Sequence, residues 1–283
     1  MILNRNFNNF KFRHKRNQNQ VIYTSRKIRD DAEILNLIDN FLQEKNSFIF
    51  ESVEKGKIKG RYTIFGKDPD KIWEFNNKNS YLITNKLKKK IKGDPNKIIE
   101  NIIEKFKFKT PPDLPPICSL ISGYFSYDSI RYVEKIPNKC KDDLKLPDVR
   151  LLRPRTLIIH DNLKKKIFYI VNVFNDEKIT NYHNKFLEIK NEINHLLVQA
   201  SMSNVDTTLD TNSAIVVKSN TSKNKFLNMV KKAKKYIKIG DIFQVVLSQR
   251  FEAKLSKKPL DIYKKLRITN PSPFMYFFNF SDF

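Results

Sequence analysis

Apolar residues recur at intervals of three or four positions in several parts of the chain, and this period predicts amphipathic helices. The predicted helices are residues 31–42, 95–106, 179–197, 223–239 and 260–267. Asp94 followed by Pro95 supplies an N-cap and a first helical residue, and Gly240 is suited to end the fourth helix. Either Asp30 or Asp31 is suited to cap the first helix.

Short runs rich in branched and aromatic residues predict strands. They are residues 47–53, 61–66, 72–75, 81–84, 117–125, 156–160, 167–174, 243–251 and 274–280. The first two strands flank a link that contains Gly56 and Gly60. Asp161-Asn162 is expected to turn a hairpin between the strands at 156–160 and 167–174.

Three further segments bear on the organisation of the chain. The first 20 residues are basic and polar, which predicts a loose leader, and residues 200–218 are rich in Ser, Asn, Thr and Asp, which is typical of a linker. The aromatic strand at 274–280 ends close to the last residue, Phe283. Because the backbone and apolar faces of such a strand need partners, we expect a truncated chain.

The charge of the chain raises a separate question. The 283 residues are 40% hydrophobic and carry a formal net charge of +24, which is compatible with nucleic acid, an anionic membrane face or an anionic substrate. The lysines are spread along the chain among Asn and Ile, without zinc-finger spacing or an RNP-like aromatic motif. We therefore interpret the charge as a compositional bias and expect no nucleic-acid partner.

The remaining composition predicts a cytoplasmic protein. Cys118 and Cys140 have neither metal-ligand spacing nor a disulfide framework, which fits ordinary thiols in a reducing compartment. No apolar run approaches the ~18 residues of a membrane helix, so no membrane interaction is expected. The histidines show no HExxH spacing, and Walker, GxGxxG and GxSxG motifs are missing from the sequence.

Glu51 and Ser52 form a first candidate binding site, because they lie where an apolar strand becomes polar. A carboxylate beside a hydroxyl can hold the ammonium and carboxylate groups of a small zwitterion. From the residues alone, the favoured interpretation is an ordinary strand end with incidental polar residues.

The run Asn270-Pro-Ser-Pro273 forms a second candidate. Its two prolines fix their own backbone and restrict the preceding residues, so the segment is stiff and suits a ligand wall. Phe274 and Met275 follow and offer a flat ring and a polarizable thioether to an aromatic ligand. Taken alone, the run is better explained as a proline-terminated helix that leads into a core strand.

Three longer stretches together resemble one family. They are FIFESVEKGKIKGRYTIFGKDP at 48–69, SGYFSYDSIRYVEKIP at 122–137, and GDIFQVVLSQRF with PLDIYKKLRITNPSPFMYFF between 240 and 278. In this order the chain resembles anthranilate synthase component I, a chorismate-using enzyme of tryptophan biosynthesis, over about residues 30–283. The second stretch is expected to be structural, a strand turning into a short helix with Asp128 near its start.

The resemblance implies an effector site for L-tryptophan, the feedback inhibitor of the family. The positions that match the family's serine and its Pro-aromatic-Met motif are Ser52, Pro273, Phe274 and Met275. Glu51 and Asn270 are expected as further contributors, and Arg61 is expected near the ligand carboxylate. The family more often has Tyr at the position of Phe274, so one hydroxyl is lost and the ring is kept.

The resemblance also implies the fold class and the domains. The fold is expected to be α+β, a mixed or antiparallel β-sandwich with helices packed outside. The expected divisions are a basic leader at 1–29, the N-terminal region of the family at 30–200, a linker at 201–219 and the start of a chorismate-binding domain at 220–283.

The implied reaction is the conversion of chorismate and ammonia to anthranilate and pyruvate by the intact subunit. Ammonia would come from a glutamine amidotransferase subunit or from solution, and Mg²⁺ would clamp the substrate carboxylates. The family's metal-binding and catalytic residues match nothing up to Phe283, so none is assigned here. The chain alone is expected to be inactive.

Other functions stay open. Aminodeoxychorismate synthase component I acts on the same substrate, although Met275 after the NPSPF run favours the anthranilate branch. A non-catalytic, tryptophan-binding regulatory module would be a stable chain that binds tryptophan unaided. A nucleic-acid binder comes last, and a lack of DNA binding at low salt would exclude it.

Overall fold

The computed structural model describes residues 3–30, 32–52, 60–77, 79–85, 87–106, 108–139, 141–201, 216–255, 257–280 and 282–283. The chain divides into two compact units. Unit 1 comprises Met1–Val205 and Leu266–Phe283, and unit 2 comprises Asp206–Lys265.

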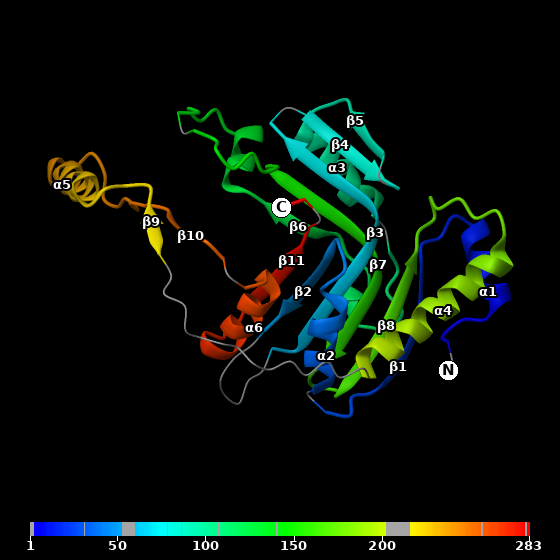
Figure 1. The fold of residues 1–283 in the computed structure, drawn as a ribbon. Helices are drawn as coiled ribbons and strands as arrows, with labels where there is room; N and C mark the ends of the chain where they lie inside the picture. The colour runs from blue at the N-terminus through cyan, green and yellow to red at the C-terminus, as the bar shows by residue number, and fades with distance from the viewer. Residues whose placement is uncertain are drawn as a thin grey trace. The chain divides into compact units, whose positions relative to one another are not determined.

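Unit 1 is built on one antiparallel sheet, whose main path runs in the order β1-β8-β7-β3-β2-β11 (Figure 1). These strands are β1 (Gln20–Lys27), β8 (Lys166–Val173), β7 (Val149–Asp161), β3 (Tyr62–Asn76), β2 (Ser47–Glu51) and β11 (Met275–Asn279). The sheet is extended by β4 (Asn79–Thr84), β5 (Leu87–Ile91) and β6 (Ser122–Phe125), which pair with β3, β4 and β7 respectively. Strand β11 therefore comes from the far end of the sequence to lie beside β2.

Successive residues of β2 face opposite sides of this sheet, so both sides need cover. Phe65, the partner of Ile49, meets the ring of Phe41 from α2 (Ala32–Phe41), which packs beside α4 (Tyr182–Ser201). On the other side, Phe48 belongs to a buried cluster that includes Leu114 and Cys118, and burial raises the pKa of the Cys118 thiol to about 11. The core thus lies on both faces of the central strands.

The first residues of the chain differ from the loose leader expected there, because they form α1 (Phe7–Lys15) and strand β1. The side chain of Asn6 accepts a hydrogen bond from the backbone of Asn9 and caps α1. Phe10 is fully buried and stacks on Phe186 of α4, with ring centroids 5.5 Å apart. The basic composition of the segment did not indicate these few apolar contacts, which attach it to unit 1.

The predicted strands at 61–66 and 72–75 are one continuous strand, β3, whose register shifts against β7 between Pro69 and Lys71. Gly66 in β3 allows a close approach, because a Cβ there would lie 2.2 Å from the ring of Phe48. The register shift follows Pro69, which fits the rule that proline within a sheet is confined to edge strands, strand starts and bulges.

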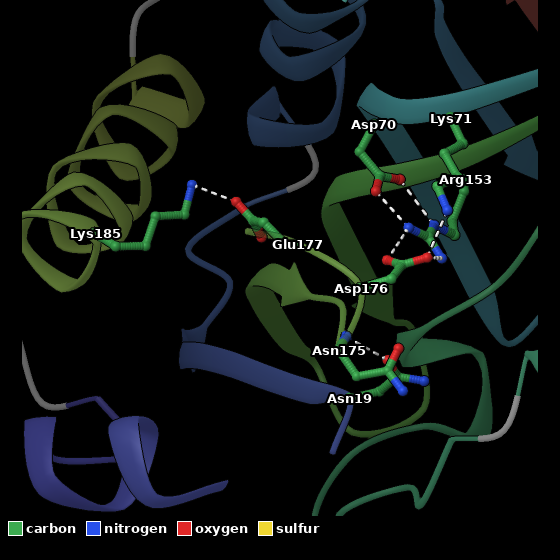
Figure 2. Close-up of polar contacts among 8 residues, drawn as sticks. All are labelled: Asn19, Asp70, Lys71, Arg153, Asn175, Asp176, Glu177 and Lys185. Carbon is green, nitrogen blue, oxygen red and sulfur yellow. Dashed lines mark hydrogen bonds and ion pairs between the residues drawn. The ribbon is translucent and has the colours of Figure 1, made fainter. Parts of the chain in front are cut away.

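An ion-pair network anchors the turn after β8 to this bulge (Figure 2). The Arg153 Nε and Nη2 atoms donate to Asp70, and Nη1 and Nη2 donate to Asp176. Lys71 adds a bond to Asp176, and the Arg153 guanidinium lies 3.9 Å from the ring centroid of Phe174.

Two further contacts hold the same turn, as Figure 2 also shows. The backbone N–H of Asn175 donates to the side-chain oxygen of Asn19 at 2.8 Å, and Lys185 of α4 pairs with Glu177 at 2.8 Å. The turn is therefore fixed to the N-terminal segment and to α4 as well as to the bulge.

The remaining helices of unit 1 follow the sequence pattern. Asp94 accepts hydrogen bonds from the backbone of Asn96 and Lys97 and caps α3 (Pro95–Lys105), and Asp30 accepts from the backbone of Glu33 at the start of α2. The predicted strand at 117–125 is shorter, since a 3₁₀ turn at Pro116–Cys118 precedes β6. A second 3₁₀ turn, Tyr127–Tyr132, has Asp128 in its first turn, as expected.

Unit 2 contains α5 (Lys223–Ile239), the short pair β9 (Val217–Ser219) and β10 (Phe251–Ala253), and the beginning of α6 (Pro259–Thr269). Gly240 ends α5 in the left-handed conformation, with φ 84°. The predicted strand at 243–251 is wrong except for its last residue, because no described strand lies beside residues 243–250 to pair with them.

The α+β fold class is confirmed, with an antiparallel sheet and helices packed outside it. The predicted domain boundaries stay a prediction, and most of the predicted linker (202–215) lies outside the described residues, as do Asp31 and Cys140. Within the described part of the chain, no helix is long and apolar enough to cross a membrane.

Candidate functional site

The candidate site lies where β2 ends and β11 begins. The two strands are antiparallel, and Glu51, the last residue of β2, pairs with Met275, the first residue of β11. Glu51 also pairs with Thr63 of β3 on its other side. Directly opposed residues share one face of a sheet, so Glu51 and Met275 are side-chain neighbours. Ser52 and Phe274 are the next residues outward along the two strands. We call Glu51, Ser52, Pro273, Phe274 and Met275 the β2–β11 end.

Glu51 is the charged residue of the β2–β11 end, and its side chain is buried, with 1% exposed. Arg267 of α6 compensates this charge, because its Nε atom lies 2.9 Å from both carboxylate oxygens of Glu51. The arginine side chain is 25% exposed, so its outer part reaches solvent. A buried carboxylate requires such a partner, because transfer of an unpaired charge from water into protein is costly.

Ser52 lies in a tight backbone crossing immediately beyond β2. A Cβ atom built at Gly60 would lie 1.8 Å from the Cβ of Ser52, so only glycine permits the two segments to approach this closely. Ser52 itself is half-buried. The side chain is thus positioned by its own backbone and by Gly60, which favours a fixed hydroxyl at the strand end.

The proline-rich run forms the connection from α6 to β11. The backbone N–H of Asn270 donates to the carbonyl of Leu266 at the end of α6, and the Asn270 side chain is exposed. Phe274 is 88% exposed although it is a large apolar residue, while Met275 is half-buried. The ring of Phe274 is therefore accessible to a ligand.

The Arg61 side chain forms an ion pair with Asp161 of β7. Its Nη2 atom lies 3.3 Å from a carboxylate oxygen of buried Asp161, and its guanidinium lies 4.8 Å from the ring centroid of Tyr62. Asn162 also binds this segment, with its side chain donating to the carbonyl of Gly60. Arg61 therefore helps to attach the start of β3 to the end of β7, and 48% of its side chain remains exposed.

The predicted site residues thus fall into two groups. Glu51, Ser52, Pro273, Phe274 and Met275 come together at the β2–β11 end, although the two segments are more than 200 positions apart in sequence. Asn270 follows α6 on the same connection, and Arg61 is tied to Asp161. Sequence reasoning missed Arg267. A basic residue in the last turn of a predicted helix was its only signal.

The Mg²⁺ site that the resemblance implies is not assigned to residues of this chain, and this expectation stays a prediction. No cluster of three His, Cys, Asp or Glu side chains among the described residues could hold a metal ion.

Comparison with known proteins gives consistent matches. A family profile described as a chorismate binding enzyme matches residues 46–283. Anthranilate synthase component 1 of Acetivibrio thermocellus is 35% identical over 254 residues, covering 88% of this chain and 51% of that protein. The protein of the same name from Cereibacter sphaeroides is 30% identical over 295 residues, covering 98% and 57%.

A solved structure also matches. The crystal structure of anthranilate synthase component I from Streptococcus pneumoniae TIGR4 has a TM-score of 0.66 and 28% identity, covering 82% of this chain and 50% of that one. The chain spans about half the length of the curated relatives it matches.

Proposed function

Because this chain belongs to the family of chorismate binding enzymes, we propose that it forms the tryptophan-binding part of an anthranilate synthase component I. The observation that carries the proposal is the pairing of Glu51 with Met275. The resemblance assigns the effector contacts to two separate segments, around Ser52 and at 273–275. The antiparallel pairing supports one shared site, since it joins these segments at one end of two neighbouring strands.

The chemistry of the β2–β11 end suits an aromatic amino acid. Phe274 offers an exposed ring for the indole, and Met275, the next residue, offers a polarizable thioether. Ser52 offers a hydroxyl that can donate to a carboxylate or accept from an ammonium group. The prolines at 271 and 273 keep the wall stiff, so little conformational entropy is lost on binding. Together these groups match the apolar and charged ends of tryptophan.

For a protein that carries this chain, we propose the reaction in the names of its relatives, the synthesis of anthranilate. Chorismate would lose pyruvate, and ammonia would come from a glutamine amidotransferase partner or from solution. Mg²⁺ and the catalytic residues are not assigned to any of the 283 residues, so we expect no conversion of chorismate by them alone. Tryptophan bound at the β2–β11 end would act as feedback inhibitor, which is allosteric only if tryptophan and chorismate affinities are coupled reciprocally.

Calorimetric titration of the chain with L-tryptophan tests the site. We expect saturable binding by the wild-type chain and its loss in Ser52→Phe, because the larger ring fills the space beside Gly60. Ser25→Phe is the matched control, since Ser25 is also half-buried but lies in β1 at the other edge of the sheet. A folded wild-type chain that shows no heat with tryptophan would contradict the proposal.

The same substitution tests the regulatory part. In an active enzyme that carries this chain, Ser52→Phe should abolish inhibition by tryptophan and leave the rate of anthranilate formation unchanged. An unaltered inhibition curve would refute the effector assignment, and aminodeoxychorismate as product would replace the reaction by that of the sister enzyme.

A further inference from the structure

Arg267 is a charged residue that contacts the β2–β11 end through Glu51. Neither the family resemblance nor the comparisons assign a role to it. It lies in the last turn of α6, a few residues before the proline-rich run, and it belongs to unit 1 together with β2 and β11. Its Nε atom binds both oxygens of Glu51 at 2.9 Å. Neither Nη atom donates a hydrogen bond to any other described residue.

The exposures of the two partners show which end of the pair a solute can reach. Glu51 has 1% of its side chain exposed and Arg267 has 25%. A ligand therefore meets the arginine side chain before it meets the carboxylate. Because Nε is committed to Glu51, the orientation of the planar guanidinium is fixed, and the two Nη atoms remain as donors.

A guanidinium with free Nη atoms is suited to carboxylates, because the planar donor set matches the two oxygens of a carboxylate. Fixing the group in advance reduces the entropy lost when the ligand binds. Arg61, the residue that the sequence favoured for this task, has its Nη2 atom on Asp161 and its guanidinium over Tyr62. The two arginines of the region thus differ in their partners, since Arg61 is held at Asp161 and Arg267 is held beside Glu51.

We propose that Arg267 binds the α-carboxylate of the amino-acid effector and that Glu51 is the positioning residue that holds Arg267 in place. This inference rests on the proposed function of the β2–β11 end and adds the specificity of that site for a free carboxylate. An aromatic amine or amide of the same shape would lack the interaction and bind more weakly.

The test compares L-tryptophan with L-tryptophan amide, which keeps the indole and the ammonium group but has no carboxylate. The wild-type chain should prefer tryptophan by on the order of tenfold to a hundredfold, since hydrogen bonds to charged groups contribute roughly that much. In Arg267→Met this ratio of affinities should fall to about one. A ratio is measured because a purely structural defect weakens both ligands equally.

Arg267→Met removes a positive charge that binds Glu51, so a second variant is needed to separate loss of binding from loss of the fold. Arg267→Lys keeps a positive charge beside Glu51 but loses the planar donor set, so it should fold and show a reduced ratio. Arg26→Met is the matched control for the loss of an ion pair. Arg26 binds both oxygens of Glu33 at 3.0 and 2.9 Å, with exposures of 26% and 7%. It should leave the ratio unchanged.

An unchanged ratio in folded Arg267→Met and Arg267→Lys would overturn the inference. A ratio that collapses in Arg61→Met and not in the Arg267 variants would also overturn it and assign the carboxylate to Arg61. Failure of the proposed function is a different result, because the wild-type chain would then bind neither ligand.

Discussion

Two arginines of unit 1, Arg153 and Arg267, bind carboxylates, but they use their donors differently. All three nitrogens of Arg153 donate, to Asp70 and Asp176, and the face of its guanidinium lies over Phe174. Among the residues that the structure describes, Arg267 donates through Nε alone, to Glu51. A guanidinium with every donor satisfied fixes the fold, whereas one with free donors at an exposed end can also bind a ligand. The unused donors of an arginine therefore indicate a ligand-binding role better than its burial does.

The largest expected effect is the removal of the fully bonded arginine. Arg153→Met leaves Asp70 and Asp176 without their main partner at the β3 bulge. The two carboxylates are 23% and 42% exposed and stay partly solvated, so the loss should be about 1–3 kcal/mol. We expect a loss of this size in the free energy of unfolding, measured by urea denaturation, with unchanged tryptophan affinity in the folded protein.

Lys71→Met is the matched control at the same cluster. It removes one outer contact to Asp176, where the two side chains are 26% and 42% exposed, so the loss should stay within about 1 kcal/mol. If both variants lose equal stability, Arg153 has no special structural role and the comparison with Arg267 fails.

A smaller effect is expected at the exposed ring of the β2–β11 end. Phe274→Ala should change the free energy of unfolding by no more than about 0.5 kcal/mol, because the side chain is 88% exposed. Tryptophan affinity should fall by up to about tenfold through the loss of ring contact. Calorimetry and urea denaturation of the same preparation separate the two effects.

Phe125→Ala is the control, since Phe125 is 57% exposed and lies in β6, outside the β2–β11 end. An equal loss of tryptophan affinity in both variants would show that the effect is not specific to the site.

The smallest effect concerns pH. Although burial alone would raise the pKa of Asp176, hydrogen bonds from Arg153 and Lys71 outweigh it and hold the pKa below its ordinary value of 3.8. The stabilisation from Asp176 is therefore fully present above that value and is lost as the pH falls through it toward the folded-state pKa. Solvent screening keeps the effect small, since 42% of the side chain is exposed.

Asp176→Asn should flatten this part of the stability profile, measured as urea midpoints between about pH 2 and pH 5. A profile that remains as steep in the variant would show that other carboxylates account for the acid sensitivity.

Local signals in the sequence predicted individual elements well. Asp94-Pro95 and Gly240 mark the boundaries of α3 and α5, and both helices form as expected. Such signals act within a few residues, through backbone donors and fixed dihedral angles, so they can be found without the fold. The prediction of a strand at 243–251 was wrong because a strand depends on more than local signals. It forms only where a neighbouring strand supplies hydrogen bonds.

The candidate site shows the same division. The sequence by itself determined the two segments, around Ser52 and Phe274, because each carries residues with recognisable chemistry and a resemblance to known motifs. Only the tertiary structure decided that Glu51 pairs with Met275, that Arg267 binds Glu51, and that the segment at 7–27 belongs to unit 1. The physical reason is that strand pairing and the pairing of buried charges join residues far apart in sequence. Neither leaves a periodic signal along the chain.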